Sequence, residues 1–393
     1  RQSQTPKPNA KRQTPKPNAK AKRQSQTPKP NAKHNAKHNA NVKHYANVKH
    51  YDTKNPMTPT TEATSTEARE AAARFQSVYT NIKQEIGRMM VGQDRVVDGV
   101  LTALFAGGHV LLEGVPGLGK TMLVRCLGEA VDLNFSRIQF TPDMMPADIQ
   151  GTQVLVEGEG GGTDLEFREG PLVANVVLAD EINRATPKTQ SALLEAMQER
   201  QITVGRRTIK LDEPYCVMAT QNPVEQEGTY PLPEAQLDRF LLKLIIGYPQ
   251  ESDYDAILDR TTGKAEVKIK PVSTGAEVNE LRAIVRDVPV PAQAKQHAIR
   301  LVMGTQPGSD YAPDVVNEYV SLGASPRGAQ ALLLVGKVRA LLDGRFSVST
   351  GDINAAAADV LRHRVMLNFH AMSDSITADT IVDAVVAKLT TAN

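Results

Sequence analysis

The chain has 393 residues, a formal net charge of +2 and 40% hydrophobic residues, which suits a globular protein of two or three domains. No apolar run approaches the roughly 18 residues that a membrane-spanning helix requires, so we expect no stable membrane insertion. The two cysteines, Cys126 and Cys216, lie in apolar segments, which disfavours a disulfide framework and favours a reducing, cytoplasmic location.

Positive charge is concentrated in the first part of the chain. Residues 1–56 hold 14 of the 46 Lys and Arg residues and one acid, Asp52, so the rest of the chain carries a net charge of −11. An acidic body without tryptophan lacks the basic stripe and stacking surfaces of nucleic-acid-binding proteins, and we expect no nucleic acid as a partner. Three copies of QTPKPNAK and few apolar residues indicate a disordered or non-native basic leader, which we favour over a native tail for nucleic acid or anionic membranes.

Beyond the leader, two helical segments precede an alternation of strands and helices. Composition predicts helices over Glu67–Met89 and Asp94–Phe105. Short strand signals then alternate with helices, and the run at Val176–Ala179 is continuously apolar, as is typical of a parallel strand covered on both faces. Strands are expected at His109–Leu112, Phe135–Phe140, Val176–Ala179, Cys216–Thr220 and Phe240–Ile246, and helices at Gly119–Val131 and Pro187–Glu199. These elements predict an α/β sandwich around a parallel sheet over residues 57–248.

Two hairpins interrupt the alternation, and a different pattern follows it. One hairpin is expected at Val154–Phe167, within an insertion near residues 152–168, and another at Gln201–Leu211, with Ile202 and Val204 opposite Ile209 and Leu211. After a linker over residues 249–274, helical periodicity without a comparable strand signal predicts a small all-α domain over residues 275–393. Its helices are expected near Glu277–Arg286, Ala292–Met303, Asp314–Leu322, Pro326–Leu342, Asp352–Arg364 and Thr377–Leu389.

A phosphate-binding loop lies between the first predicted strand and the helix after it. The motif G-x-x-x-x-G-K-[ST] is matched in full by Gly114, Val115, Pro116, Gly117, Leu118, Gly119, Lys120 and Thr121. Its glycines let backbone N–H groups surround phosphate oxygens, and the following helix adds its positive end. Lys120 is expected to reach the β- and γ-phosphates of ATP, and the Thr121 hydroxyl to bind Mg²⁺.

Two acids follow the third predicted strand. Asp180 and Glu181 end the apolar run that begins at Val176, so they emerge at the carboxyl end of the sheet, where ligands bind. Asp180 is expected to hold Mg²⁺ through water, and Glu181 to orient or deprotonate the attacking water. A run ending in two acids is a weak signal alone, but the preceding P-loop makes it specific.

The motifs together resemble those of AAA+ ATPases, and more narrowly the MoxR group. The resemblance rests on Gln139–Asp143, Phe167–Pro171, Asp180–Ala185, Thr220–Pro223 and Glu234–Phe240, which occur in order over nearly all of the chain after the leader. It implies an AAA+ P-loop domain followed by an all-α lid. The insertion near residues 152–168 is similar to the helix-2 insert that marks this clade.

The resemblance also assigns roles to single residues. Asn222 would be the sensor-1 residue that polarises the attacking water, although an isolated Asn-Pro is otherwise typical of a turn. Arg239 would be an arginine finger for the neighbouring subunit, with an ion pair to Asp238 as the alternative. Arg327, at the start of a helix, would be sensor 2. The segment Val91, Gly92 and Gln93 would lie against the adenine.

Other residues leave alternatives open. Arg184, Arg206 and Arg207 either act across a subunit boundary or line a pore or, as we favour, lie on a solvated surface. The pair Met144–Met145 either packs within its loop or contacts a partner.

A finger supplied by a neighbour implies a closed ring of identical subunits, commonly a hexamer. The resemblance implies a chaperone-like motor that uses ATP and Mg²⁺ to remodel, mature or activate a client protein or complex, with a von Willebrand factor A-domain protein as partner. Three alternatives remain, namely a magnesium-chelatase-like motor, a DNA-associated motor, and a nucleotide-gated scaffold with little hydrolysis.

Overall fold

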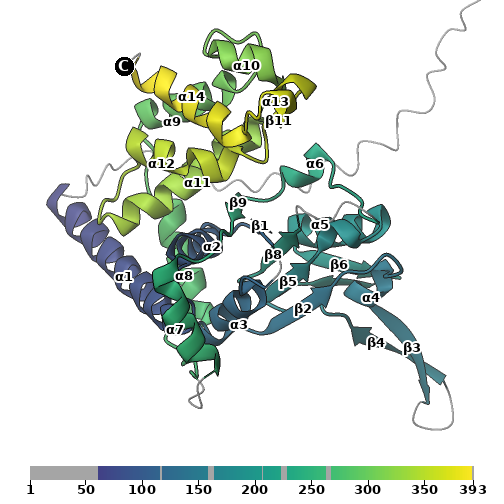
Figure 1. The fold of residues 1–393 in the computed structure, drawn as a ribbon. Helices are drawn as coiled ribbons and strands as arrows, with labels where there is room; N and C mark the ends of the chain where they lie inside the picture. Colours follow the sequence, from purple (N-terminus) through teal and green to yellow (C-terminus); the bar gives the residue numbers. More distant parts are fainter. Residues whose placement is uncertain are drawn as a thin grey trace, which may run out of the picture. The chain divides into compact units, whose positions relative to one another are not determined.

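Figure 1 shows the computed structural model, which describes residues 61–115, 117–157, 163–205, 207–222, 228–262 and 267–391. The predicted leader, Pro116 of the phosphate-binding loop and Arg206 lie outside the described residues. The nature of residues 1–56 therefore stays a prediction.

Five parallel strands form the central sheet, in the order β2-β5-β8-β1-β9. Their bounds are Val110–Glu113 for β1, Phe135–Gln139 for β2, Val176–Asp180 for β5, Cys216–Gln221 for β8 and Leu242–Ile245 for β9. In the register of the sheet, Gln139 lies beside Asp180 and Glu113 beside Gln221. The loops after these strands therefore meet at the carboxyl edge of the sheet, where ligands of parallel sheets bind.

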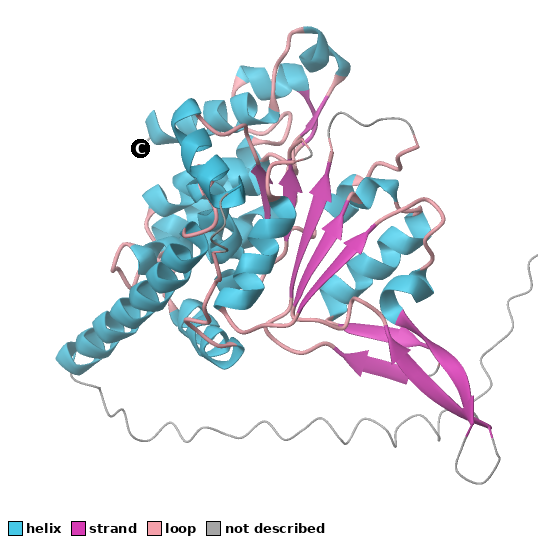
Figure 2. Ribbon diagram, turned by 60° about the horizontal axis from the view of Figure 1, so that its bottom comes forward, coloured by secondary structure: helices cyan, strands magenta, loops and turns pink. Residues whose placement is uncertain are grey.

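Each face of the sheet has its own hydrophobic core, because alternate residues of a strand point to opposite faces. Along β5, Val176 and Leu178 pack into the first core, and Val177 and Ala179 into the second. Figure 2 shows the strands of this sheet with helices on either side, which confirms the predicted α/β fold. The helices are α1 (Thr61–Gly87), α2 (Asp94–Ala106) and α3 (Lys120–Ala130) at the first core, and α5 (Pro187–Glu199) at the second.

Both predicted hairpins are present. β3 (Gly151–Glu157) pairs with β4 (Thr163–Glu169), and β6 (Gln201–Val204) with β7 (Arg207–Lys210). In the second hairpin Ile202 faces Ile209, but Val204 faces Arg207 and the Leu211 N–H donates to the Arg200 carbonyl, so the predicted set of facing residues is only partly found. Three short helices complete this part of the chain, α4 (Pro146–Gln150), the 3₁₀ helix η1 (Ile182–Arg184) and α6 (Glu234–Leu237).

Residues 267–391, which we call the C-terminal helical region, are mostly helical, as predicted. Its elements are α8 (Gly275–Asp287), α9 (Ala292–Gly304), α10 (Asp314–Tyr319), β10 (Val320–Leu322), α11 (Pro326–Leu342), α12 (Thr350–Leu361), β11 (Met366–Leu367), α13 (Phe369–Ser373) and α14 (Ala378–Thr391). The short antiparallel pair of β10 with β11 was not predicted, and the predicted linker contains a helix, α7 (Glu251–Thr262). None of the described helices is long and apolar enough to span a membrane.

The first core continues from the sheet into the C-terminal helical region. Leu112 of β1 and Phe105 of α2 belong to the same cluster of buried side chains as Leu332 of α11 and Val385 of α14. α1 packs against both α3 and α11, and its Phe75 ring meets Phe105 edge to face with centroids 5.0 Å apart. The sheet and the C-terminal helices are therefore stabilised by one shared core.

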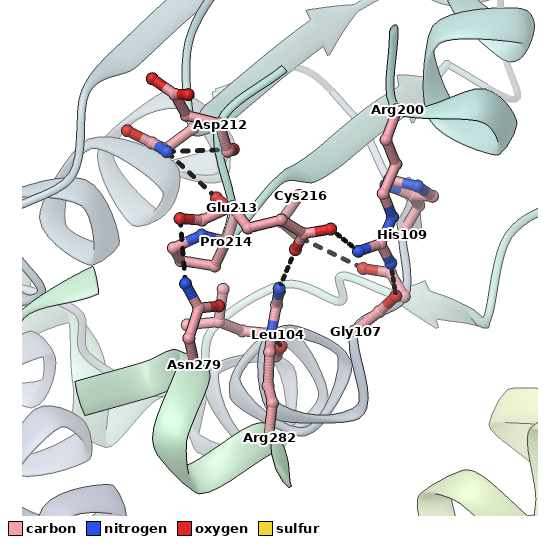
Figure 3. Close-up of polar contacts among 12 residues, drawn as sticks. Leu104, Gly107, His109, Arg200, Asp212, Glu213, Pro214, Cys216, Asn279 and Arg282 are labelled. Atoms are coloured by element: carbon pink, nitrogen blue, oxygen red, sulfur yellow. Dashed lines mark hydrogen bonds and ion pairs between the residues drawn. The ribbon is translucent and has the colours of Figure 1, made fainter. Parts of the chain in front are cut away.

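A polar cluster ties α8 to the amino ends of β1 and β8, opposite the carboxyl edge of the sheet (Figure 3). Glu213, in the loop before β8, accepts hydrogen bonds from Arg200 and, at 2.7 Å, from Arg282 of α8. Arg282 also donates to the Leu104 carbonyl at 2.7 Å, and Asn279 donates to the Glu213 carbonyl at 3.0 Å. Burial lowers the pKa of Arg282 to about 10, and these acceptors bind donors of its buried guanidinium.

Candidate active site

A cavity of about 440 Å³, which we call the P-loop cavity, opens at the carboxyl edge of the sheet, and its volume is in the range of small-molecule sites. The structure brings together in it part of the predicted site, from three separate segments of the chain. These residues are Gly117, Gly119, Lys120, Thr121, Asp180, Glu181 and Asn222, whereas Gly114, Val115 and Leu118 of the predicted loop do not line the cavity. The cavity is lined by Gly117, Gly119, Lys120, Thr121, Met122, Arg125, Arg137, Gln139, Asp180, Glu181, Thr220 and Asn222.

The loop between β1 and α3 has the backbone that phosphate binding requires. Gly117 and Gly119 adopt φ angles of 86° and 79°, in the left-handed region where a Cβ would be strained. α3 begins directly after them, so its positive end lies at the cavity. The Lys120 ammonium donates to the Gly114 carbonyl at 2.6 Å, and burial lowers the pKa of Lys120 while the acids at the end of β5 oppose that shift. This donor set fits a polyphosphate.

Asp180 is held on both of its carboxylate oxygens. Thr220 of β8 donates to Oδ1 at 2.6 Å, and Arg137 of β2 donates to Oδ2 through Nη2 at 2.7 Å and Nε at 3.2 Å. The buried Asp180 carboxylate and the Thr121 hydroxyl line the same cavity, and together they are an oxygen donor set that fits Mg²⁺.

Glu181 follows in an unusual backbone conformation. Its φ is 57°, in the left-handed region that residues other than glycine rarely adopt, and its N–H donates to Thr220 Oγ1 at 2.8 Å. Its carboxylate accepts from Gln139 Nε2 at 2.9 Å and pairs with Arg184 Nε at 3.1 Å. Arg184 therefore contacts the predicted base, where the sequence favoured a solvated surface.

Arg137 and Gln139 are among the lining side chains to which the sequence assigned no role. Arg137 and Gln139 are alternate residues of β2, so both point to the same face of an edge strand that ends beside Asp180. The sequence does carry a signal for them. Arg137 and Gln139 are polar residues at alternate positions near the end of a predicted strand, and such residues can face a strand that ends in an acid.

The predicted finger and sensor-2 residues do not line the P-loop cavity. Arg239 and Arg327 instead line a second cavity of about 240 Å³, together with Arg200 and Arg364, and we call it the arginine cavity. Arg239 Nη1 donates to the Leu194 carbonyl at 2.9 Å, while its Nε is buried without a hydrogen-bond partner among the described residues. Four guanidinium groups around one small cavity favour an anionic occupant.

Asp238 is the acid of the arginine cavity. Its Oδ1 accepts from Arg364 at 2.8 Å, and its Oδ2 accepts from Ser325 at 2.8 Å and lies 3.6 Å from Arg327 Nη1. Asp238 thus pairs with arginines of the C-terminal helical region. The alternative ion pair between Asp238 and Arg239 is not the arrangement found.

The predicted adenine segment lies beside the P-loop. The Met90 methyl group is 3.5 Å from where a Cβ on Gly119 would stand. Gln93 donates to the Gly247 carbonyl at 3.1 Å, and Gly92 has a φ of 68° and lies against Asp253 of α7. A Cβ at position 92 would force the Asp253 side chain to move, and the positive φ itself favours glycine there.

Known proteins resemble this chain in sequence and in fold. Residues 109–242 match the ATPase family associated with various cellular activities (AAA), and residues 313–385 match the AAA lid domain. A crystal structure of a candidate ATPase from Cytophaga hutchinsonii aligns with a TM-score of 0.76 at 38% identity, covering 83% of this chain and 98% of that one.

Relatives over most of the chain carry the name MoxR. The chain is 42% identical over 301 residues to the chaperone MoxR1 of Mycobacterium tuberculosis, which covers 77% of this chain and 79% of the relative. It is 33% identical over 328 residues to the protein MoxR of Methylorubrum extorquens, covering 78% of this chain and 90% of the relative. Together with the P-loop cavity and the five-stranded sheet, these likenesses mean that the chain belongs to the MoxR family of AAA+ ATPases.

Proposed function

We propose that this chain hydrolyses ATP as a closed ring of identical subunits, commonly a hexamer, in which each active site takes groups from two neighbours. The observation that carries the proposal is the division of the predicted site between two cavities. Lys120 and Asp180 line one, and Arg239 and Arg327 line the other. In the folded chain the two sets line separate cavities, whereas a ring of copies can bring the arginines of one copy to the nucleotide of the next.

The residues of the P-loop cavity divide the chemistry among them. Lys120 and the start of α3 would bind the phosphates, and Thr121 and Asp180 would hold Mg²⁺. When bound, Mg²⁺ would neutralise charge on the β- and γ-phosphate oxygens. Glu181 would accept a proton from the attacking water, which Asn222 would orient, and adenine would lie near Val91–Gln93.

The arginine cavity would receive the phosphates bound by the neighbour. Arg239 has a buried Nε without a partner and Arg327 has half of its side chain exposed, which supports a role for both toward a group from outside the chain. Placing both arginines in one cavity favours sensor 2 acting on the same neighbouring nucleotide as the finger. Planar guanidinium groups suit this task, since they donate in forks to phosphate oxygens.

The free energy of ATP hydrolysis would drive the remodelling, maturation or activation of a client protein. The name of the mycobacterial relative, chaperone MoxR1, supports a chaperone-like role. A von Willebrand factor A-domain partner rests on the family resemblance alone, and the client is the target of the trapping experiment below.

The test is steady-state ATPase activity of the full chain beside two variants. We expect Glu181→Gln to bind ATP but lose about 100-fold or more in turnover, and Arg239→Ala to lose on the order of 1,000-fold. Arg300→Ala is the control, because Arg300 lies over the Tyr311 ring, away from both cavities, and should keep full activity. The Glu181→Gln chain, held with ATP, would then serve to capture the client.

A mixing experiment tests the shared site directly. Lys120→Ala and Arg239→Ala chains, each inactive, should regain activity when mixed, because an intact P-loop cavity then meets an intact arginine cavity in about a quarter of the contacts of a random ring. Full turnover by Arg239→Ala in a dilute monomer, or a mixture that stays inactive, would contradict the proposal.

A further inference from the structure

The guanidinium of Arg137 is paired with Asp180, the carboxylate that the proposed function assigns to Mg²⁺. Arg137 donates to its Oδ2 twice, at 2.7 and 3.2 Å, and Thr220 occupies Oδ1. The Asp180 side chain is 12% exposed and that of Arg137 is 44% exposed, so the carboxylate stays in place while the guanidinium is free to leave toward solvent.

The same guanidinium reaches the second acid of the site. Arg137 Nη2 also donates to Gln139 Oε1, and Gln139 Nε2 donates to Glu181 at 2.9 Å. All four side chains line the P-loop cavity. A chain of hydrogen bonds therefore runs from the predicted metal ligand through Arg137 to the predicted base.

We propose that Arg137 is the resident counter-ion of Asp180, which Mg²⁺ must displace when nucleotide binds, and that Arg137 thereby sets the Mg²⁺ dependence of nucleotide binding. The inference rests on the proposed function, in that the P-loop cavity takes Mg²⁺ with a nucleotide. Mg²⁺ binds only the fraction of chains in which this oxygen of Asp180 is not paired with Arg137, so the ion pair weakens the apparent affinity for the metal. Removal of Arg137 thus favours the metal, and the nucleotide through the metal.

Arg125 is a matched control for Arg137. It lines the same cavity and carries the same charge, but it pairs with Glu129 at 3.7 Å along its own helix. Loss of either arginine changes the long-range potential of the cavity by one charge. Only the loss of Arg137 frees an oxygen of Asp180.

The experiment measures binding of a fluorescent ADP analogue to the full chain, first in EDTA and then with increasing Mg²⁺. We expect Arg137→Gln to lower the Mg²⁺ concentration for half-maximal enhancement by about threefold to tenfold, and to leave affinity in EDTA within about twofold of the wild type. Arg125→Gln should shift affinity alike in both conditions. Arg137→Lys, which keeps the charge but donates less specifically, should lie between wild type and Arg137→Gln.

Each other outcome has a distinct meaning. If Arg137→Gln weakens binding equally with and without Mg²⁺, Arg137 is a phosphate ligand and the inference is wrong. If Arg137→Gln matches the wild type in both conditions, the ion pair has no bearing on the metal, and the inference is also wrong. A wild-type chain that binds no nucleotide in either condition overturns the proposed function, and the inference with it.

Discussion

Arg364 of the C-terminal helical region donates to Asp238, the residue before the predicted finger, at 2.8 Å. The Arg364 side chain is 3% exposed, and it also donates to the Phe240 carbonyl at 2.7 Å. Because Arg239 lies between Asp238 and Phe240 in the chain, its backbone is fixed on both sides by one buried guanidinium. The position of the predicted finger therefore depends on the C-terminal helical region.

Loss of Asp238 should destabilise the protein strongly. Asp238→Ala leaves Arg364 buried without its carboxylate, and we expect the free energy of unfolding to fall by about 2–4 kcal/mol. Asp343→Ala is the matched control, because Asp343 is 64% exposed and its partner Arg345 keeps Asp352, so the expected loss is below about 1 kcal/mol. Urea denaturation measures the free energy of unfolding of both variants. Equal losses would mean that the buried pair stabilises the fold no more than an exposed pair does.

Glu213, at the opposite edge of the sheet, is also expected to stabilise the fold through a buried arginine. Glu213→Ala removes the carboxylate from Arg282, whose pKa burial already lowers, and should lower the free energy of unfolding by about 2–3 kcal/mol. Glu280→Ala breaks the exposed pair with Arg74 and should cost at most about 0.5 kcal/mol. Chemical denaturation would contradict this prediction if the two variants were equally stable.

His109 should make stability depend on pH. Burial lowers its pKa in the folded chain to about 4, whereas an unfolded chain protonates histidine near pH 6.5. Between these values the unfolded state binds the extra proton, so stability falls as pH is lowered from about 6.5 toward 4. Between pH 7 and 5 the wild type should lose about 2 kcal/mol more than His109→Gln. Parallel pH profiles for the two chains would show that His109 is not the titrating group.

Arg327 should behave as part of the same shared site as Arg239. If both act on the nucleotide of one neighbour, Arg327→Ala mixed with Lys120→Ala should regain ATPase activity, since about a quarter of the contacts in a random ring are then intact. Arg327→Ala mixed with Arg239→Ala should stay inactive, because no chain then has a complete arginine cavity. Recovery in this second mixture would mean that Arg327 serves the nucleotide of its own chain.

Much of the fold follows from local pattern. The five strands of the sheet were predicted to within about two residues, because short segments rich in apolar residues alternate with helical segments along this part of the chain. α7 was not predicted, since it has no buried side chain and so no apolar stripe to detect. β10 and β11 are three and two residues long, too short for any periodicity, and their pairing joins segments that lie far apart in the sequence.

The candidate site was predictable where its residues are consecutive in the sequence and form a recognisable motif. The P-loop and the pair Asp180–Glu181 are such motifs, and the structure brings them together. Arg137 could not be assigned, because its contact with Asp180 depends on which strand lies beside β5. The placement of Arg327 in the arginine cavity likewise depends on how α11 packs against the rest of the chain.

The shared first core limits how the C-terminal helical region can move. Leu332 and Val385 pack in one continuous apolar cluster with Leu112 of the sheet. Separating the C-terminal helical region from the sheet would therefore expose apolar surface to water. Motion is therefore restricted to small sliding of packed helices, as in a shear rather than a hinge. The same continuity means that heat should melt both parts in a single cooperative transition.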